Sequence, residues 1–98
     1  MRYVSTRGGA DPVSLSDAVE RGLAPDGGLY VPEAYPAIPP EALDGVDSLP
    51  GVAERVLAPF FAGDALAPAL GDVCREAFAF PVPLRELRDG TAVLELFH

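Results

Sequence analysis

The most regular hydrophobic pattern lies in the second half of the chain. Apolar residues between positions 49 and 61 recur at helical spacing. Ser48 suits the N-cap of this helix, and Pro59, which donates no backbone hydrogen bond, predicts a kink or an end just before it. A short break at residues 63–64 leads to a second helix, whose predicted buried stripe comprises Leu66, Leu70, Val73, Cys74, Ala77 and Phe78. Two helices joined by so short a break predict a helical hairpin.

A shorter helix is predicted in the first quarter of the chain. Ser14 can act as its N-cap, and Asp17, three residues on, can answer it as in a capping box. Leu15, Ala18, Val19 and Leu23 then share one face. Gly22 can close the helix in the left-handed conformation.

Three segments have the composition of short strands: residues 2–5, 29–31 and 91–97. We expect them to form one small sheet. Residues 84–87 are predicted to be a turn or a short extended piece, and the proline-rich residues 32–50 a connection that wraps over the surface. The expected fold class is α+β, a small sheet of short strands with about three helices, two of which form a helical hairpin.

Composition limits the possible partners. The formal net charge is −8, and all seven cationic residues are arginines. An acidic surface repels phosphate backbones and anionic lipid, so nucleic-acid and membrane binding are disfavoured. No apolar run approaches the roughly 20 residues that a membrane span needs. The single cysteine cannot form an internal disulfide, which favours a cytoplasmic location.

Two turn motifs could carry chemistry. Ser5, Thr6 and Arg7 precede a glycine pair, and their hydroxyl and guanidinium groups could bind a phosphate or a carboxylate. The alternative is a structural turn at a strand end. Asp26 and Tyr30 bracket a glycine-rich loop, which either faces a ligand or leads into a strand with a packed tyrosine.

Few residues remain for catalysis. His98 follows the last predicted strand and could donate a hydrogen bond to a cofactor or act as an acid/base group, although a structural role is more common. Cys74 is expected to be a buried packing thiol. One histidine and one cysteine exclude the usual zinc sites, so no metal is expected. Without lysine, an imine to a carbonyl cofactor can form only at the terminal amine.

In combination, these motifs resemble the N-terminal region of threonine synthase. The matching runs are residues 3–8, 18–32 and 94–98, in the order and spacing of the family. The run Gly-Leu-Ala-Pro-Asp-Gly-Gly-Leu-Tyr at residues 22–30 is highly specific. Residues 34–80 match the family in their pattern of residue types rather than in residue identity.

The resemblance implies a pyridoxal-phosphate enzyme of the tryptophan-synthase-β-like group, a lyase of threonine biosynthesis. Such enzymes convert O-phospho-L-homoserine and water to L-threonine and phosphate. In the family, the motif that ends here at His98 continues as Gly-Pro-Thr and soon reaches the lysine that holds the cofactor. Residues 1–98 are therefore expected to be the N-terminal domain, cut before that lysine. They would be inactive alone, would bind no cofactor themselves, and would partner the catalytic domains of the same chain.

The resemblance also suggests site residues. Ser5, Thr6, Arg7, Asp26 and Tyr30 are candidates for contacts with the small-molecule substrate, with the alternative that both turns only brace the domain. The last residue, the histidine, is a candidate for a place near the cofactor, and no residue is expected to be catalytic. An alternative function is a free-standing interaction or anion-binding module of the same fold. Apolar surface on the last strand is expected to be exposed and could allow self-association.

Overall fold

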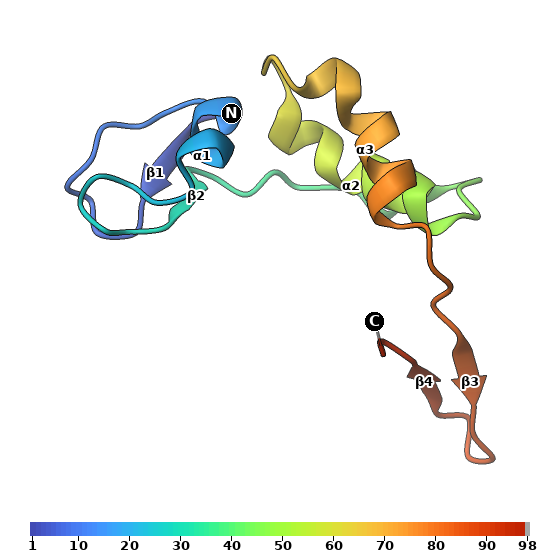
Figure 1. The fold of residues 1–98 in the computed structure, drawn as a ribbon. Coiled ribbons are helices and arrows are strands. Elements are labelled where there is room, and N and C mark those ends of the chain that lie inside the picture. Colours follow the sequence, from blue (N-terminus) through green and yellow to red (C-terminus); the bar gives the residue numbers. More distant parts are fainter. Residues whose placement is uncertain (98) are drawn as a thin grey trace.

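The computed structural model describes residues 1–97, which form an elongated molecule (Figure 1). Its extents are 51 × 27 × 25 Å and its radius of gyration is 16.6 Å, whereas a compact chain of this length would have about 13 Å. Three parts follow one another: an N-terminal lobe (residues 1–32), a helical hairpin (residues 49–77) and a β-hairpin (residues 84–94). The α+β class predicted from the sequence is confirmed.

The N-terminal lobe is built around a two-stranded antiparallel sheet. Strand β1 (Tyr3–Ser5) pairs with β2 (Tyr30–Pro32) over three residue pairs. The backbone of Tyr3 also exchanges two hydrogen bonds of 2.9 Å with that of Val13. The expected strands near residues 2–5 and 29–31 therefore meet, although they lie far apart in the sequence.

Helix α1 (Leu15–Arg21) covers this sheet and forms as its sequence predicts. The Ser14 hydroxyl accepts a hydrogen bond from the Asp17 amide at 3.1 Å, and Gly22 closes the helix with φ 73°. Buried residues of α1 pack against β1 in a small core, which consists of Tyr3, Leu15 and Ala18. The rest of the predicted apolar face is wrong: Val19 is 66 % exposed, and Leu23, which lies beyond the end of the helix, is 60 % exposed.

The helical hairpin consists of α2 (Leu49–Phe61) and α3 (Leu70–Ala77), which pack side by side. The Ser48 hydroxyl caps α2 by accepting from the Gly51 amide at 3.2 Å. Pro59 lies in the last turn of α2, and the helix runs two residues beyond it. Short 3₁₀ turns, residues 40–43 and 67–69, precede the two helices.

The buried stripe predicted for α3 is partly wrong. Leu70 and Cys74 are buried, but Val73 is 51 % exposed and Ala77 is also exposed. Within residues 1–97, α2 is the helix that packs along α3. A single neighbouring helix can bury only part of the apolar stripe, so the remaining apolar residues of α3 stay exposed.

Several hydrogen bonds tie the lobe to the helical hairpin. The Tyr3 hydroxyl donates to the Phe60 carbonyl at 3.1 Å. The Asp64 carboxylate, between α2 and α3, accepts from the amide and the hydroxyl of Ser16 at 3.1 and 3.2 Å. These contacts fix α1 against the start of the loop that joins the two longer helices.

The prediction of one sheet with three strands is wrong. Strand β4 (Ala92–Leu94) pairs with β3 (Leu84–Glu86) in a separate antiparallel hairpin. The intervening turn contains Gly90 at φ 78°, and the Asp89 carboxylate accepts from the Thr91 amide at 3.1 Å. A strand joined by so short a turn pairs locally because closing a short loop costs less entropy than reaching a distant lobe.

No helix within residues 1–97 is long and apolar enough to cross a membrane.

Candidate functional site

The two turn motifs singled out from the sequence meet at the edge of the N-terminal lobe. Ser5 ends β1 and is almost fully buried, with 6 % of its surface exposed. Its hydroxyl lies 2.7 and 2.8 Å from the two carboxylate oxygens of Asp26. A hydroxyl has one proton, so it donates to either oxygen of the carboxylate.

The Asp26 carboxylate also accepts from two backbone amides. The Gly9 amide donates to one oxygen at 2.8 Å, and the Gly28 amide to the other at 2.9 Å. The hydrogen bonds from Ser5 and Gly28 are the main causes that lower the pKa of Asp26, since they favour the charged form. We call this arrangement of Ser5, Gly9, Asp26 and Gly28 the Asp26 clasp.

Arg7 and Thr6 extend the clasp. The Arg7 amide donates to the Ser5 hydroxyl at 3.1 Å, and Nη1 of its guanidinium donates to the Asp26 carbonyl at 3.0 Å. Thr6 holds the next residue of the loop, because its hydroxyl accepts from the Leu29 amide at 3.0 Å. The structure therefore brings Ser5, Thr6, Arg7 and Asp26 into one network.

The clasp explains one glycine of the specific run. A Cβ atom at Gly28 would lie 2.1 Å from the Ser5 hydroxyl and 3.1 Å from the Arg7 backbone nitrogen. No side chain fits there without moving β1 or the loop. Gly27 has φ 79°, which favours glycine. Each glycine of the pair thus has its own structural reason.

Tyr30 lies opposite Ser5 in the sheet but outside the clasp. Its hydroxyl is enclosed and has no hydrogen-bond partner among residues 1–97. Tyr30 and Arg21 border a hollow of about 260 Å³, together with Asp11 and other residues of the lobe. The phenol raises the pKa of the Arg21 guanidinium, although no contact between them has hydrogen-bond geometry.

The remaining sequence candidates fall outside this site. His98 lies outside the described residues. Cys74 is 1 % exposed, and burial raises the pKa of its thiol, which agrees with a packing role. Among residues 1–97, no group of three or more histidine, cysteine or carboxylate side chains could hold a metal ion.

The geometry assigns different capacities to the clustered residues. The Asp26 carboxylate already accepts from three donors of its own chain, which leaves it little capacity for a ligand. Arg7 has an exposed guanidinium with five N–H groups, of which one is used by the Asp26 carbonyl. The arrangement can therefore hold Arg7 at a defined position and present its remaining donors to an anion.

Sequence reasoning missed the amides of Gly9 and Gly28 as partners of Asp26. The glycines were visible, but only the fold shows that their amides converge on one carboxylate. Asp64 was read as part of a break between helices, whereas it also joins that break to α1. An aspartate after a glycine gives no signal of so distant a contact.

Comparison with known proteins places these features in a family. A family described as "Threonine synthase N terminus" matches residues 2–78. The threonine synthase of Pseudomonas aeruginosa is 40 % identical over the whole of this chain, which corresponds to 22 % of that protein. The human protein named threonine synthase-like 2 is also 40 % identical over the whole chain, again 22 % of its length.

Two solved structures share the fold. The PLP-bound threonine synthase of Brucella melitensis matches the whole chain with a TM-score of 0.83 and 44 % identity. The threonine synthase of Escherichia coli matches it with a TM-score of 0.82 and 28 % identity. In both structures the match covers 23 % of the solved chain. The present chain thus spans about a fifth of the length of the curated relatives it matches.

Proposed function

The chain belongs to the threonine synthase family and corresponds to its N-terminal part. From this premise we propose that it forms the N-terminal domain of a threonine synthase. The proposed reaction converts O-phospho-L-homoserine and water to L-threonine and phosphate in threonine biosynthesis. One observation carries the proposal: the whole chain has the fold of the N-terminal part of a threonine synthase, at a TM-score of 0.83. The proposed domain is residues 1–98, and the proposed partners are the catalytic domains.

The cofactor of the proposed enzyme is pyridoxal phosphate, which supplies an electron sink when it is bound through a lysine imine. The residues of this chain do not fit that role, because none of them is a lysine. We therefore propose that the cofactor is held outside residues 1–98 and that these residues alone are inactive. The proposed location is cytoplasmic, as expected for a chain whose single cysteine is a buried thiol.

The proposed role of the Asp26 clasp is to position Arg7 for the substrate. Ser5, Thr6 and Asp26 hold the two turns together through hydrogen bonds of 2.7–3.0 Å. Arg7 carries a guanidinium whose donors suit the phosphate or the carboxylate of O-phospho-L-homoserine. Tyr30 lies beside the clasp, and its enclosed hydroxyl has no hydrogen-bond partner among residues 1–97. His98 is proposed to lie near the cofactor.

The substrate role of Arg7 is tested by Arg7→Ala. The change is made in a chimera in which residues 1–98 replace the matching N-terminal part of the P. aeruginosa enzyme. A hydrogen bond to a charged group contributes about 1.5–3 kcal/mol. We therefore expect KM for O-phospho-L-homoserine to rise roughly tenfold to a hundredfold. Steady-state phosphate release measures both KM and kcat.

The matched control is Arg2→Ala. Arg2 is an exposed arginine of the same lobe, and its guanidinium lies 3.9 Å from the Glu33 carboxylate. This variant removes the same charge away from the clasp and should leave both constants unchanged. If Arg7→Ala also leaves kcat and KM unchanged, Arg7 has no substrate role and the clasp only braces the domain.

A further inference from the structure

The β-hairpin lacks the packing that would stabilise it. All residues of β3 and β4 are exposed. An isolated two-stranded hairpin is marginally stable in water, and three or more strands or a packed helix are needed to secure it. Figure 1 shows the hairpin projecting from the helices with no other element beside it. Within residues 1–97, nothing covers either face of this sheet.

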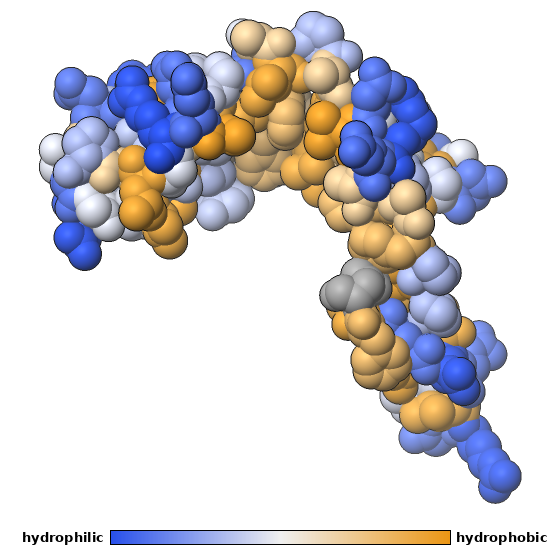
Figure 2. All heavy atoms as spheres, in the orientation of Figure 1, coloured by the Kyte–Doolittle hydropathy of each residue, from blue (hydrophilic) through white to orange (hydrophobic). Residues whose placement is uncertain are grey.

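One face of the hairpin carries a pair of exposed leucines, beside Ala92 and Glu86. Leu84 and Leu94 lie directly opposite each other, so their side chains share a face. They are 62 % and 54 % exposed, and Phe97, just beyond β4, is 92 % exposed. Figure 2 shows apolar residues along this arm of the molecule, where a solvated surface would be polar.

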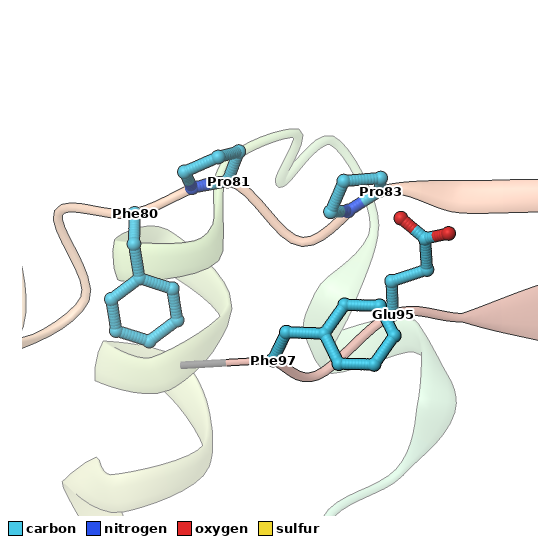
Figure 3. A pocket seen from close by; sticks show the side chains of 5 residues that line it. All are labelled: Phe80, Pro81, Pro83, Glu95 and Phe97. Atoms are coloured by element: carbon cyan, nitrogen blue, oxygen red, sulfur yellow. The ribbon is translucent and has the colours of Figure 1, made fainter.

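A groove lies at the base of the hairpin, between it and the helices. Phe80, Pro81, Pro83, Glu95 and Phe97 line a hollow of about 250 Å³. In Figure 3 the rings of Phe80 and Phe97 both border it, and they come from the two segments that flank the hairpin. Glu95 forms an ion pair with Arg85. We call the exposed apolar surface that comprises Leu84, Leu94, Phe97 and this groove the hairpin face.

The chain exposes more surface than a compact protein of its mass, and the excess is large enough for a protein–protein interface. Its accessible area is 6977 Å², whereas a compact monomer of this mass would expose about 5,400 Å². A stable interface buries about 800 Å² on each partner. The excess of roughly 1,600 Å² therefore exceeds one side of an ordinary protein–protein interface.

We propose that the hairpin face is the docking surface for the remaining three quarters of a threonine synthase chain. The B. melitensis structure matches the whole of the present chain, including the β-hairpin, within a protein about four times as long. This occupant is favoured over a second copy, because two copies at −8 each repel one another. The inference rests on the proposed function and names the surface through which the domain joins the enzyme.

The test is hydrogen exchange on the chimera with the P. aeruginosa enzyme. Backbone amides of residues 84–94 are followed by mass spectrometry in the chimera and in the 98-residue chain. We expect these amides to exchange at least tenfold more slowly in the chimera. Leu94→Asp, which places a charge on the hairpin face, should remove this protection, and phosphate release should fall with it.

The matched control is Leu23→Asp, a leucine of the N-terminal lobe that is 60 % exposed. It should leave the protection of residues 84–94 intact. Fast exchange of these amides in an active chimera would overturn the docking proposal and leave the proposed function standing. Slow exchange in a chimera without activity would support docking while the proposed function fails. Protection that rises with concentration in the 98-residue chain alone would identify a second copy as the occupant and overturn the proposal.

Discussion

Asp26 shows how a single side chain can organise two distant turns. Its carboxylate accepts from the Ser5 hydroxyl and from the amides of Gly9 and Gly28, so three donors from two segments converge on it. A carboxylate with this many donors is stabilised in its charged form. Charge at Asp26 and the geometry around Arg7 are therefore coupled.

This coupling predicts a pH dependence. The pKa of Asp26 in the folded chain lies below its ordinary value. A depressed pKa contributes stability that is present above the unfolded value, about 3.9, and is lost as pH falls through the folded value. Asp26→Asn should therefore lower the melting temperature at pH 7 and flatten its decline below about pH 4. Thermal melts of both proteins from pH 7 to pH 2 measure this.

Asp44→Asn serves as the control for Asp26→Asn. Asp44 is exposed, and within residues 1–97 its carboxylate accepts no hydrogen bond. Its substitution should leave the pH profile of the melting temperature unchanged. Parallel acid profiles for the native chain and Asp26→Asn would show that the clasp contributes nothing to stability through its charge.

At the scale of elements, the contact between α2 and α3 holds the helical hairpin. Leu70 and Cys74 are the buried residues of α3, while no residue of α2 is fully buried. The hairpin thus has a thin core in this chain. The half-buried apolar face of α2 is consistent with further packing in a larger protein.

Cys74→Ser tests this thin core. Cys74 is 1 % exposed, and burying a hydroxyl without a partner costs about 1–3 kcal/mol. We expect the free energy of unfolding to fall by about this amount. Val73→Ser, at the neighbouring position that is 51 % exposed, should change it by less than about 0.5 kcal/mol. Urea unfolding followed by the helical circular-dichroism signal measures both, and equal losses would contradict the observed orientation of α3.

At the scale of the molecule, the extended shape and the missing lysine lead to the same expectation. The chain is long and thin for its length, and its last strand projects away from the other parts. Under the docking proposal, the rest of the enzyme would cover the exposed hairpin face. Without lysine, the cofactor of the proposed enzyme has no side chain to which it can bind covalently.

We therefore predict that the 98-residue chain releases no phosphate from O-phospho-L-homoserine in the presence of pyridoxal phosphate. An acetylated N-terminus removes the one remaining amine that could form an imine, so no imine absorbance should appear. The chimera, assayed in parallel, provides the positive control. Phosphate release by the acetylated chain would contradict both the inactivity and the assignment of the cofactor to another part of the protein.

The sequence by itself determined what depends on neighbours in the chain. Helical spacing located α2 and α3, and Ser14 and Gly22 marked the ends of α1, because caps and periodicity act over a few residues. The specific run at residues 22–30 and its glycines indicated a demanding turn. Those features also carried the resemblance to threonine synthase, which the comparisons confirmed.

Only the tertiary structure decided which distant segments meet. The partner of β4 was predicted wrongly, because a strand pattern states that a segment pairs and not with what. Convergence of Gly9, Gly28 and Ser5 on Asp26 likewise depends on how β1 and β2 bring two turns together. The physical reason is that long-range contacts are selected by competition among loop closures and packing surfaces, and no local pattern encodes that competition.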